Sequence, residues 1–193
     1  MEIVKYPHPA LRRVARPIER VTDQVRRLAE EMLRLMHEAP GVGLAANQVG
    51  VPVQLFVVAD AADPFGENKD RVFINPEILD RSGQCTREEG CLSFPGIYAE
   101  IVRPERIRVR AMDLSGEIFE VECADLPARV IQHEWDHLRG ILFIDRMLPL
   151  QKRKLLPQLR QLEREYRALQ REGVIPPDAQ LREALAQVEA AYS

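Results

Sequence analysis

The stretch at residues 41–50, "GVGLAANQVG", separates two fold classes for this chain of 193 residues. Gly41, Gly43 and Ala46 form the pattern G-x-G-x-x-A, and Asp60 ends the apolar run that follows. Glycines at this spacing, followed by an acidic residue, are the dinucleotide-binding fingerprint of a doubly wound α/β domain. The first question is therefore whether this loop binds a phosphate.

The segments on either side of the loop contradict the fingerprint. A dinucleotide-binding loop follows a strand and begins a helix. Residues 23–38 come before the loop and have apolar positions at helical spacing, which predicts a helix there. After the loop, Gly50 and Pro52 prevent a helix from continuing. We therefore predict no nucleotide site, and the glycines serve either as a tight link or as a place where another group approaches the main chain.

The remaining pattern predicts an α+β fold, because strands and helices do not alternate regularly. The expected strands are at residues 53–59, 72–79, 101–112 and 117–123, and the expected helices are at 125–138 and 150–172. A short amphipathic helix follows the Pro176–Pro177 pair.

Composition predicts a globular protein without strong attraction to nucleic acid or to anionic membranes. The chain is 46% apolar and 30% charged, with a net charge of −3. Its N-terminus, "MEIVKYPHPALRR", lacks the apolar core of a signal peptide. No apolar run approaches the ~20 residues that cross a bilayer. Three cysteines argue against a disulfide scaffold, and we expect a cytoplasmic protein.

A pair of histidines stands out in "IQHEWDHLRG", at residues 131–140. The motif H-E-x-x-H consists of His133, Glu134 and His137. Residues four apart share one face of a helix, so two imidazoles can bind one metal ion. Glu134 can then take a proton from water at the open coordination position. The alternative is a charged helix end with packed or solvated histidines, and we favour the metal site.

A metal site needs a third ligand from the protein. Phe143 occupies the place of the third histidine in the protease pattern H-E-x-x-H-x-x-G-x-x-H. Glu163, Glu165 and Asp145 are poor candidates because they lie beyond the end of the helix. Cys91, among the turn residues of "EEGCLSFPG", would complete a three-ligand site with one open position. A buried cysteine in a turn and a Cys–His nucleophile pair remain alternatives, but neither explains the H-E-x-x-H motif.

Three stretches, "GVGLAANQ", "EGCLS" and "QHEWDH", together resemble the three motifs of the peptide deformylases. "IVKYPHPALRRVA" and "FINPEI" are also similar, so the resemblance covers about residues 1–165. It implies an α+β fold in which mixed or antiparallel sheets wrap around the helix bearing the histidines, with a helix at the C-terminus. We expect one catalytic domain at residues 1–172 and a helical extension of unknown role at 173–193.

The resemblance also implies the chemistry. Cys91, His133 and His137 would bind one divalent ion, with water as the fourth ligand. Fe²⁺ is the expected metal, and Zn²⁺, Ni²⁺ and Co²⁺ are alternatives. The reaction would remove the formyl group from the N-terminal formylmethionine of new polypeptides and release formate. Glu134 would take the proton from the bound water and return it to the leaving amine.

The loop at residues 41–50 receives a role from the same resemblance. The side-chain amide of Gln48 and the backbone N–H of Leu92 would stabilise the oxyanion formed during attack. The substrate backbone would run alongside Val42 and Gly43 as an added strand. Residues implied in substrate binding are Gly41, Val42, Gly43, Tyr98, Leu126 and Val130.

Three charged residues near these motifs carry separate expectations. Arg129 stands where the family commonly has an apolar residue, and we expect it at the rim of the methionine pocket with its head group in water. Glu89 and Arg103 are expected to form a pair that steadies the Cys91 loop.

Two other functions compete with deformylation. A metallo-peptidase would use the same H-E-x-x-H motif, but the missing third histidine and the context of Cys91 count against it. A structural metal site would need neither Glu134 nor Gln48. The expected partners are formylmethionyl nascent peptides, with no membrane and no sequence-specific nucleic acid. Weak association with the ribosome through residues 151–172 is a hypothesis.

Overall fold

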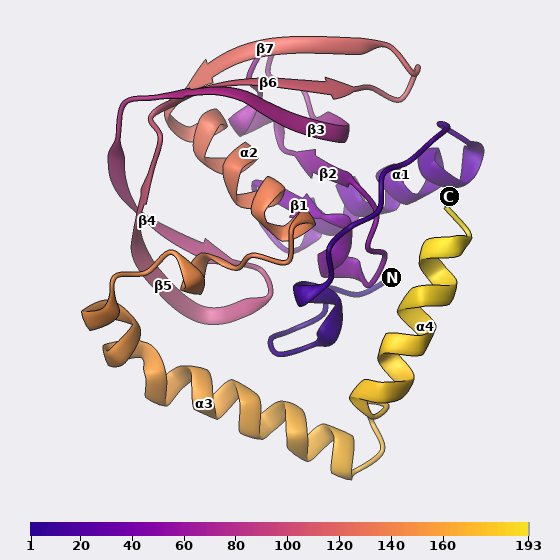
Figure 1. The fold of residues 1–193 in the computed structure, drawn as a ribbon, viewed down its shortest axis with the longest axis vertical. Helices are drawn as coiled ribbons and strands as arrows, with labels where there is room; N and C mark the ends of the chain where they lie inside the picture. Colours follow the sequence, from indigo (N-terminus) through magenta and orange to yellow (C-terminus); the bar gives the residue numbers. More distant parts are fainter. Residues whose placement is uncertain (193) are drawn as a thin grey trace.

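The computed structural model describes residues 1–192 and confirms an α+β fold built around helix α2 (Asp125–Leu138) (Figure 1). Two antiparallel sheets surround this helix. The larger sheet has the order β1-β2-β3-β6-β7, formed by Gly43–Ala45, Leu55–Val58, Arg71–Ser82, Arg106–Met112 and Ile118–Ala124. The smaller sheet pairs β4 (Cys85–Cys91) with β5 (Phe94–Arg103). The histidine-bearing helix is therefore enclosed, as the sequence predicted.

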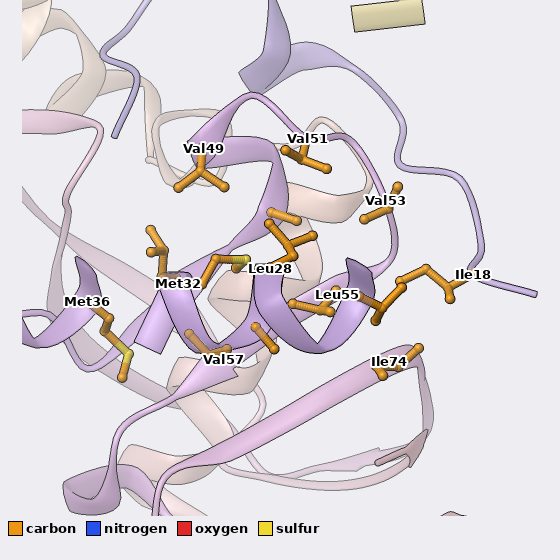
Figure 2. Packing of buried hydrophobic residues seen from close by; sticks show 14 of the residues in the cluster. Ile18, Leu28, Met32, Met36, Val49, Val51, Val53, Leu55, Val57 and Ile74 are labelled. Atoms are coloured by element: carbon orange, nitrogen blue, oxygen red, sulfur yellow. The ribbon is translucent and has the colours of Figure 1, made fainter. Parts of the chain in front are cut away.

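Helix α1 (Asp23–Glu38) has the predicted bounds and covers the β1–β2 end of the large sheet. It begins at Thr22, whose side chain accepts a hydrogen bond from the backbone N–H of Val25. Most of its apolar face is buried, and Figure 2 shows Leu28 and Met32 close to the strand residue Leu55. Removal of this apolar area from water stabilises the side of the fold that carries the 41–50 loop.

Two helices follow α2 in the sequence and lie on the outside of the molecule. Helix α3 (Pro149–Arg171) lies close to the predicted bounds and continues through Pro157. Helix α4 (Asp178–Ala190) turns back to lie beside the N-terminal segment (Figure 1). Four short 3₁₀ helices complete the helical elements of residues 1–192: η1 (Pro9–Arg12), η2 (Ala46–Val49), η3 (Asp60–Ala62) and η4 (Phe143–Asp145). Within these residues no helix is both long and apolar enough to span a bilayer.

The prediction of one strand over residues 101–112 was wrong. Strand β5 ends at Arg103 and β6 begins at Arg106, and the two belong to different sheets. Within residues 101–112 the buried residues of both strands fall on odd positions, namely 101 and 103 in β5 and 107, 109 and 111 in β6, so the alternation has the same phase on both sides of the turn and hides it. Strand β4 was not predicted because its sequence, "CTREEGC", is mostly charged or small.

The surroundings of Cys91 also differ from the prediction. The sequence placed this cysteine in a loop, but it is the last residue of β4 and pairs with Phe94 across a tight hairpin. The ring of Phe94 stacks on Tyr6, with centroids 4.8 Å apart, and meets Phe143 edge-on at 5.2 Å. This aromatic cluster holds the tip of the hairpin close to the end of α2.

Candidate active site

One cleft, with a volume of about 520 Å³, collects the residues that the sequence singled out. Its walls come from the 41–48 loop, the β4–β5 hairpin and α2. The lining includes Gly41, Val42, Gly43, Gln48, Cys91, Leu92, Tyr98, Leu126, Val130, His133 and Glu134. The remaining candidate, His137, lies beside Cys91, with its Nε2 3.3 Å from the sulfur.

Three potential metal ligands meet at the bottom of this cleft. Ligand atoms of Cys91, His133 and His137 all lie within 4.8 Å of one another. One turn of α2 separates the two histidines, and their rings have centroids 5.0 Å apart. A thiolate with two imidazoles is a donor set that suits Zn²⁺, Fe²⁺ and related ions. The residues present therefore fit one divalent metal ion.

The two imidazoles differ in their environment. Nδ1 of His133 lies 3.1 Å from the Glu89 carboxylate, which leaves Nε2 for a metal. Burial lowers the pKa of His133, but hydrogen bonds to Cys91 and Glu89 outweigh burial and raise it. Burial and the charge of His133 lower the pKa of His137. His137 is therefore neutral, which is the form that binds a metal.

A buried ionic network supports His133 from behind. Glu89 accepts hydrogen bonds from Nε and Nη2 of Arg103, at 2.6 and 2.9 Å. This pair agrees with the expectation from the sequence. Arg103 also donates to Asp136 at 2.8 Å, and Arg146 donates to the same carboxylate at 2.5 Å. Burial raises the pKa of Glu89, but bonds from His133 and Arg103 outweigh it and hold this carboxyl well below its usual range.

The position of Arg129 contradicts the expectation that its head group lies in water. It is only 8% exposed, and its guanidinium donates to Glu89 at 2.5 Å. It also donates to the backbone carbonyls of Ile101 at 3.0 Å and Cys85 at 2.8 Å. The physical reason is that Glu89, buried beside the site, is stabilised by further positive charge and donors. Arg129 therefore ties α2 to the β4–β5 hairpin.

Glu134 lies in the cleft with its carboxylate buried. Its side-chain Oε2 has no hydrogen-bond partner within residues 1–192. Burial raises the pKa of Glu134 to about 7, against the opposing effects of His133 and Arg103. A Cβ atom at Gly43 would lie 2.6 Å from Oε1 of this carboxylate and 2.8 Å from Val130. Gly43 is therefore needed because α2 approaches the loop here, which is the second of the two roles that the sequence left open for the glycines.

The amide of Gln48 is directed toward the same place. Its Oε1 accepts a hydrogen bond from the backbone N–H of Ala45 at 2.8 Å. Nε2 consequently faces the sulfur of Cys91 at 3.4 Å and the hydroxyl of Ser93 at 3.3 Å. The carbonyl of Leu92 accepts from Nζ of Lys5 at 2.7 Å. The sequence reading missed Lys5 and Ser93, although Ser93 ends the "EGCLS" motif.

Comparison with known proteins gives the family. The family model described as polypeptide deformylase matches residues 1–153 of this chain. The chain belongs to this family. The peptide deformylase of Alkalilimnicola ehrlichii is 48% identical over 167 residues, which cover 86% of this chain and 93% of that protein. The peptide deformylase of Rhodopirellula baltica is 43% identical over an alignment that covers all of this chain, including residues 173–193, and 96% of the relative.

Solved deformylase structures share the fold. The crystal structure of Arabidopsis thaliana peptide deformylase 1B in complex with an inhibitor matches with a TM-score of 0.83 at 42% identity. That match covers 91% of this chain and 96% of the other. As a peptide deformylase, the protein is a hydrolase of N-formyl groups on nascent peptides.

Proposed function

We propose that this deformylase removes the formyl group from the N-terminal formylmethionine of new polypeptides, with Glu134 as general base and general acid. The observation that carries the proposal is the buried carboxylate of Glu134, whose Oε2 has no hydrogen-bond partner within residues 1–192, in the cleft that Cys91 and His133 also line. A structural metal site would need no such group.

The metal would be held by Cys91, His133 and His137, with Fe²⁺ as the expected ion and Zn²⁺, Ni²⁺ and Co²⁺ as alternatives. A bound divalent ion supplies Lewis acidity, which polarises a carbonyl and lowers the pKa of water. Glu89 orients one of the ligands by accepting from Nδ1 of His133.

The protein side chains supply proton transfer and charge stabilisation. Glu134 takes a proton from the attacking water and gives it to the leaving amine, and a pKa of about 7 suits both steps. The Gln48 amide and the Leu92 backbone N–H donate to the oxygen of the formyl group as it becomes negative. Loss of one such donor typically costs about 2.7–4 kcal/mol of transition-state stabilisation.

The substrate backbone would add to β1, which is the edge strand at one end of the large sheet. Val42 and Leu126 are 42% and 41% exposed at the cleft. These apolar surfaces, with Val130, suit a methionine side chain. Tyr98, 60% exposed at the cleft, would contact the substrate residues that follow the methionine.

The test is release of formate from formyl-Met-Ala-Ser by protein purified without oxygen and loaded with Fe²⁺ or Ni²⁺. Glu134→Ala should lower kcat by at least about 100-fold while metal content stays the same. The matched control is Glu30→Ala, an exposed glutamate of α1, which should behave as wild type. No formate from metal-loaded wild type, or cleavage of unformylated peptides instead, would overturn the proposal.

A cytoplasmic location stays a prediction. We also infer weak association with the ribosome through α3. A surface groove next to Pro7 is lined by one acidic residue of α3, Glu163, and by four arginines of the same helix: Arg160, Arg164, Arg167 and Arg171. Basic side chains in a groove attract a phosphate backbone. The double variant Arg160→Glu, Arg164→Glu should lose salt-dependent co-sedimentation with ribosomes. The control, Arg20→Glu with Arg106→Glu, reverses two exposed arginines outside α3, and equal loss in both would refute the inference.

A further inference from the structure

Helix α4 carries a buried acidic residue far from the cleft in sequence. Glu189 is 2% exposed. Its carboxylate accepts hydrogen bonds from Nε and Nη2 of Arg13, the second at 2.6 Å, and Nε of Arg16 lies 3.4 Å away. Because two nitrogens of the guanidinium bond the same carboxylate in a two-pronged contact, the relative orientation of the two side chains is fixed as well as their distance. A buried carboxylate is costly to desolvate, so its presence here calls for a specific role.

Arg13, the partner of Glu189, belongs to the N-terminal segment that holds η2. The backbone carbonyl of Arg13 accepts a hydrogen bond from Nδ2 of Asn47 at 2.7 Å, and the carbonyl of Ala10 accepts from the same nitrogen at 3.2 Å. Asn47 is completely buried and directly precedes Gln48. The N–H of Val4 donates to the carbonyl of Gln48 at 2.8 Å. The N-terminal segment therefore holds the backbone of the residue that points its amide at the cleft.

Apolar contacts of α4 act in the same direction. Val188 of α4 and Tyr192, just after the end of the helix, pack against the buried cluster that contains Val49 and Val51, at the end of η2 and just after it. Figure 1 shows α4 lying along the N-terminal segment, on the side of the molecule away from β4 and β5. The potential metal ligands are on α2 and β4. The N-terminal segment also meets the last residue of α2, where the N–H of Ala15 donates to the carbonyl of Leu138 at 2.8 Å.

We propose that Glu189 and Arg13 are positioning residues for Gln48, so that α4 keeps the oxyanion donor in place. Glu189 holds Arg13, the carbonyl of Arg13 holds Asn47, and Asn47 sets the backbone of η2. Oε1 of Gln48 accepts a hydrogen bond from Ala45, the residue directly before η2. The side chain of Gln48 therefore moves with η2, and a shift of η2 moves Nε2 relative to Cys91. The proposal rests on the proposed role of Gln48 in deformylation, and it gives the extension at residues 173–193 a function.

The first test compares Glu189→Gln with Glu183→Gln, an exposed glutamate on the same helix. Glu189→Gln should lower kcat for formyl-Met-Ala-Ser on the order of tenfold. KM should stay within about twofold, because Gln48 acts on charge that develops only in the transition state. The absorption spectrum of the Co²⁺-loaded variant should match that of wild type. Glu183→Gln should keep wild-type kcat.

A second measurement separates positioning from general stability. In the background Gln48→Ala, Glu189→Gln should cause no further loss of kcat, since the two residues act through one interaction. Hydrogen exchange of the backbone amides at residues 46–49 should accelerate in Glu189→Gln, while exchange at residues 129–134 in the middle of α2 stays the same. Equal losses of kcat in both backgrounds, or unchanged exchange at 46–49, would overturn the proposal.

Failure of the proposed function would look different. If metal-loaded wild type releases no formate, deformylation by this site is refuted, while the exchange experiment still tests whether Glu189 holds η2. If Glu189→Gln does not fold, Arg13→Lys replaces it in both measurements. Lysine keeps the positive charge but cannot make the two-pronged contact, so the same loss of kcat and the same faster exchange are expected.

Discussion

At position 43 a side chain of any size would collide with the carboxylate proposed as the general base. A Cβ there would lie 2.6 Å from Oε1 of Glu134, so Gly43→Ala forces that carboxylate to move. Misplacement of a reacting group by about 1 Å can cost on the order of 100-fold in rate. We expect Gly43→Ala to lower kcat/KM for formyl-Met-Ala-Ser at least about tenfold. Wild-type activity in this variant would show that Glu134 acts from another position.

Arg129 joins two elements behind the metal ligands. Its replacement by methionine would remove one donor from Glu89 and leave the carbonyls of Ile101 and Cys85 without this partner. Loss of buried charged hydrogen bonds predicts a fall in the free energy of unfolding of about 3 kcal/mol, measured by urea denaturation. Arg110→Met, which removes a half-exposed surface arginine, should change it by less than about 1 kcal/mol. Similar losses in the two variants would contradict this role.

At the scale of elements, Asp63 organises the loop between η3 and β3. Its side chain, 1% exposed, accepts hydrogen bonds from the backbone N–H groups of Phe65, Glu67 and Lys69 and from Nε of Arg71 at 2.8 Å. Burial raises its pKa, but these bonds outweigh burial and lower it from 3.8 to about 2. The stabilisation is therefore complete above pH 4 and is lost as pH falls toward 2.

This shift predicts a measurable pH dependence. Between pH 5 and pH 3, the free energy of unfolding of wild type should fall by about 1 kcal/mol more than that of Asp63→Asn, as determined from urea denaturation at each pH. Asp23→Asn, at an 89% exposed aspartate of α1, should keep the wild-type slope. If Asp63→Asn had the same slope as wild type, the Asp63 carboxylate would not be protonating in this range.

At the scale of the whole molecule, a metal would join α2 to the β4–β5 hairpin. His133 and His137 lie on the helix and Cys91 ends β4, so a bound ion adds a link between two elements. A ligand present at about 100 times its Kd stabilises the folded state by about 2.7 kcal/mol. Chelation should therefore lower the Tm of wild type by about 5–10 °C, measured by calorimetry. Cys91→Ala should lose most of this response, and an equal response would rule out the cysteine as a ligand.

Local sequence pattern was enough to predict those features of this protein that depend on residues close together in the chain. The apolar spacing of α1 and the four-residue separation of His133 and His137 follow from the helical repeat, which any sequence segment carries by itself. The resemblance carried by three short motifs then predicted the fold and the family. The turn at Pro104 was not predicted because the alternation of buried residues has the same phase in the strands before and after it.

Contacts between residues far apart in sequence could not be predicted from local pattern. Arg129 became part of the network around Glu89, 40 positions away, and Gly43 proved necessary because Glu134 approaches it. Glu189 reaches Arg13 across 176 positions. Such contacts depend on how complete elements pack together, and burial then decides which charges must be paired. The sequence by itself therefore determined the chemistry that is available, and packing determined which side chains hold that chemistry in place.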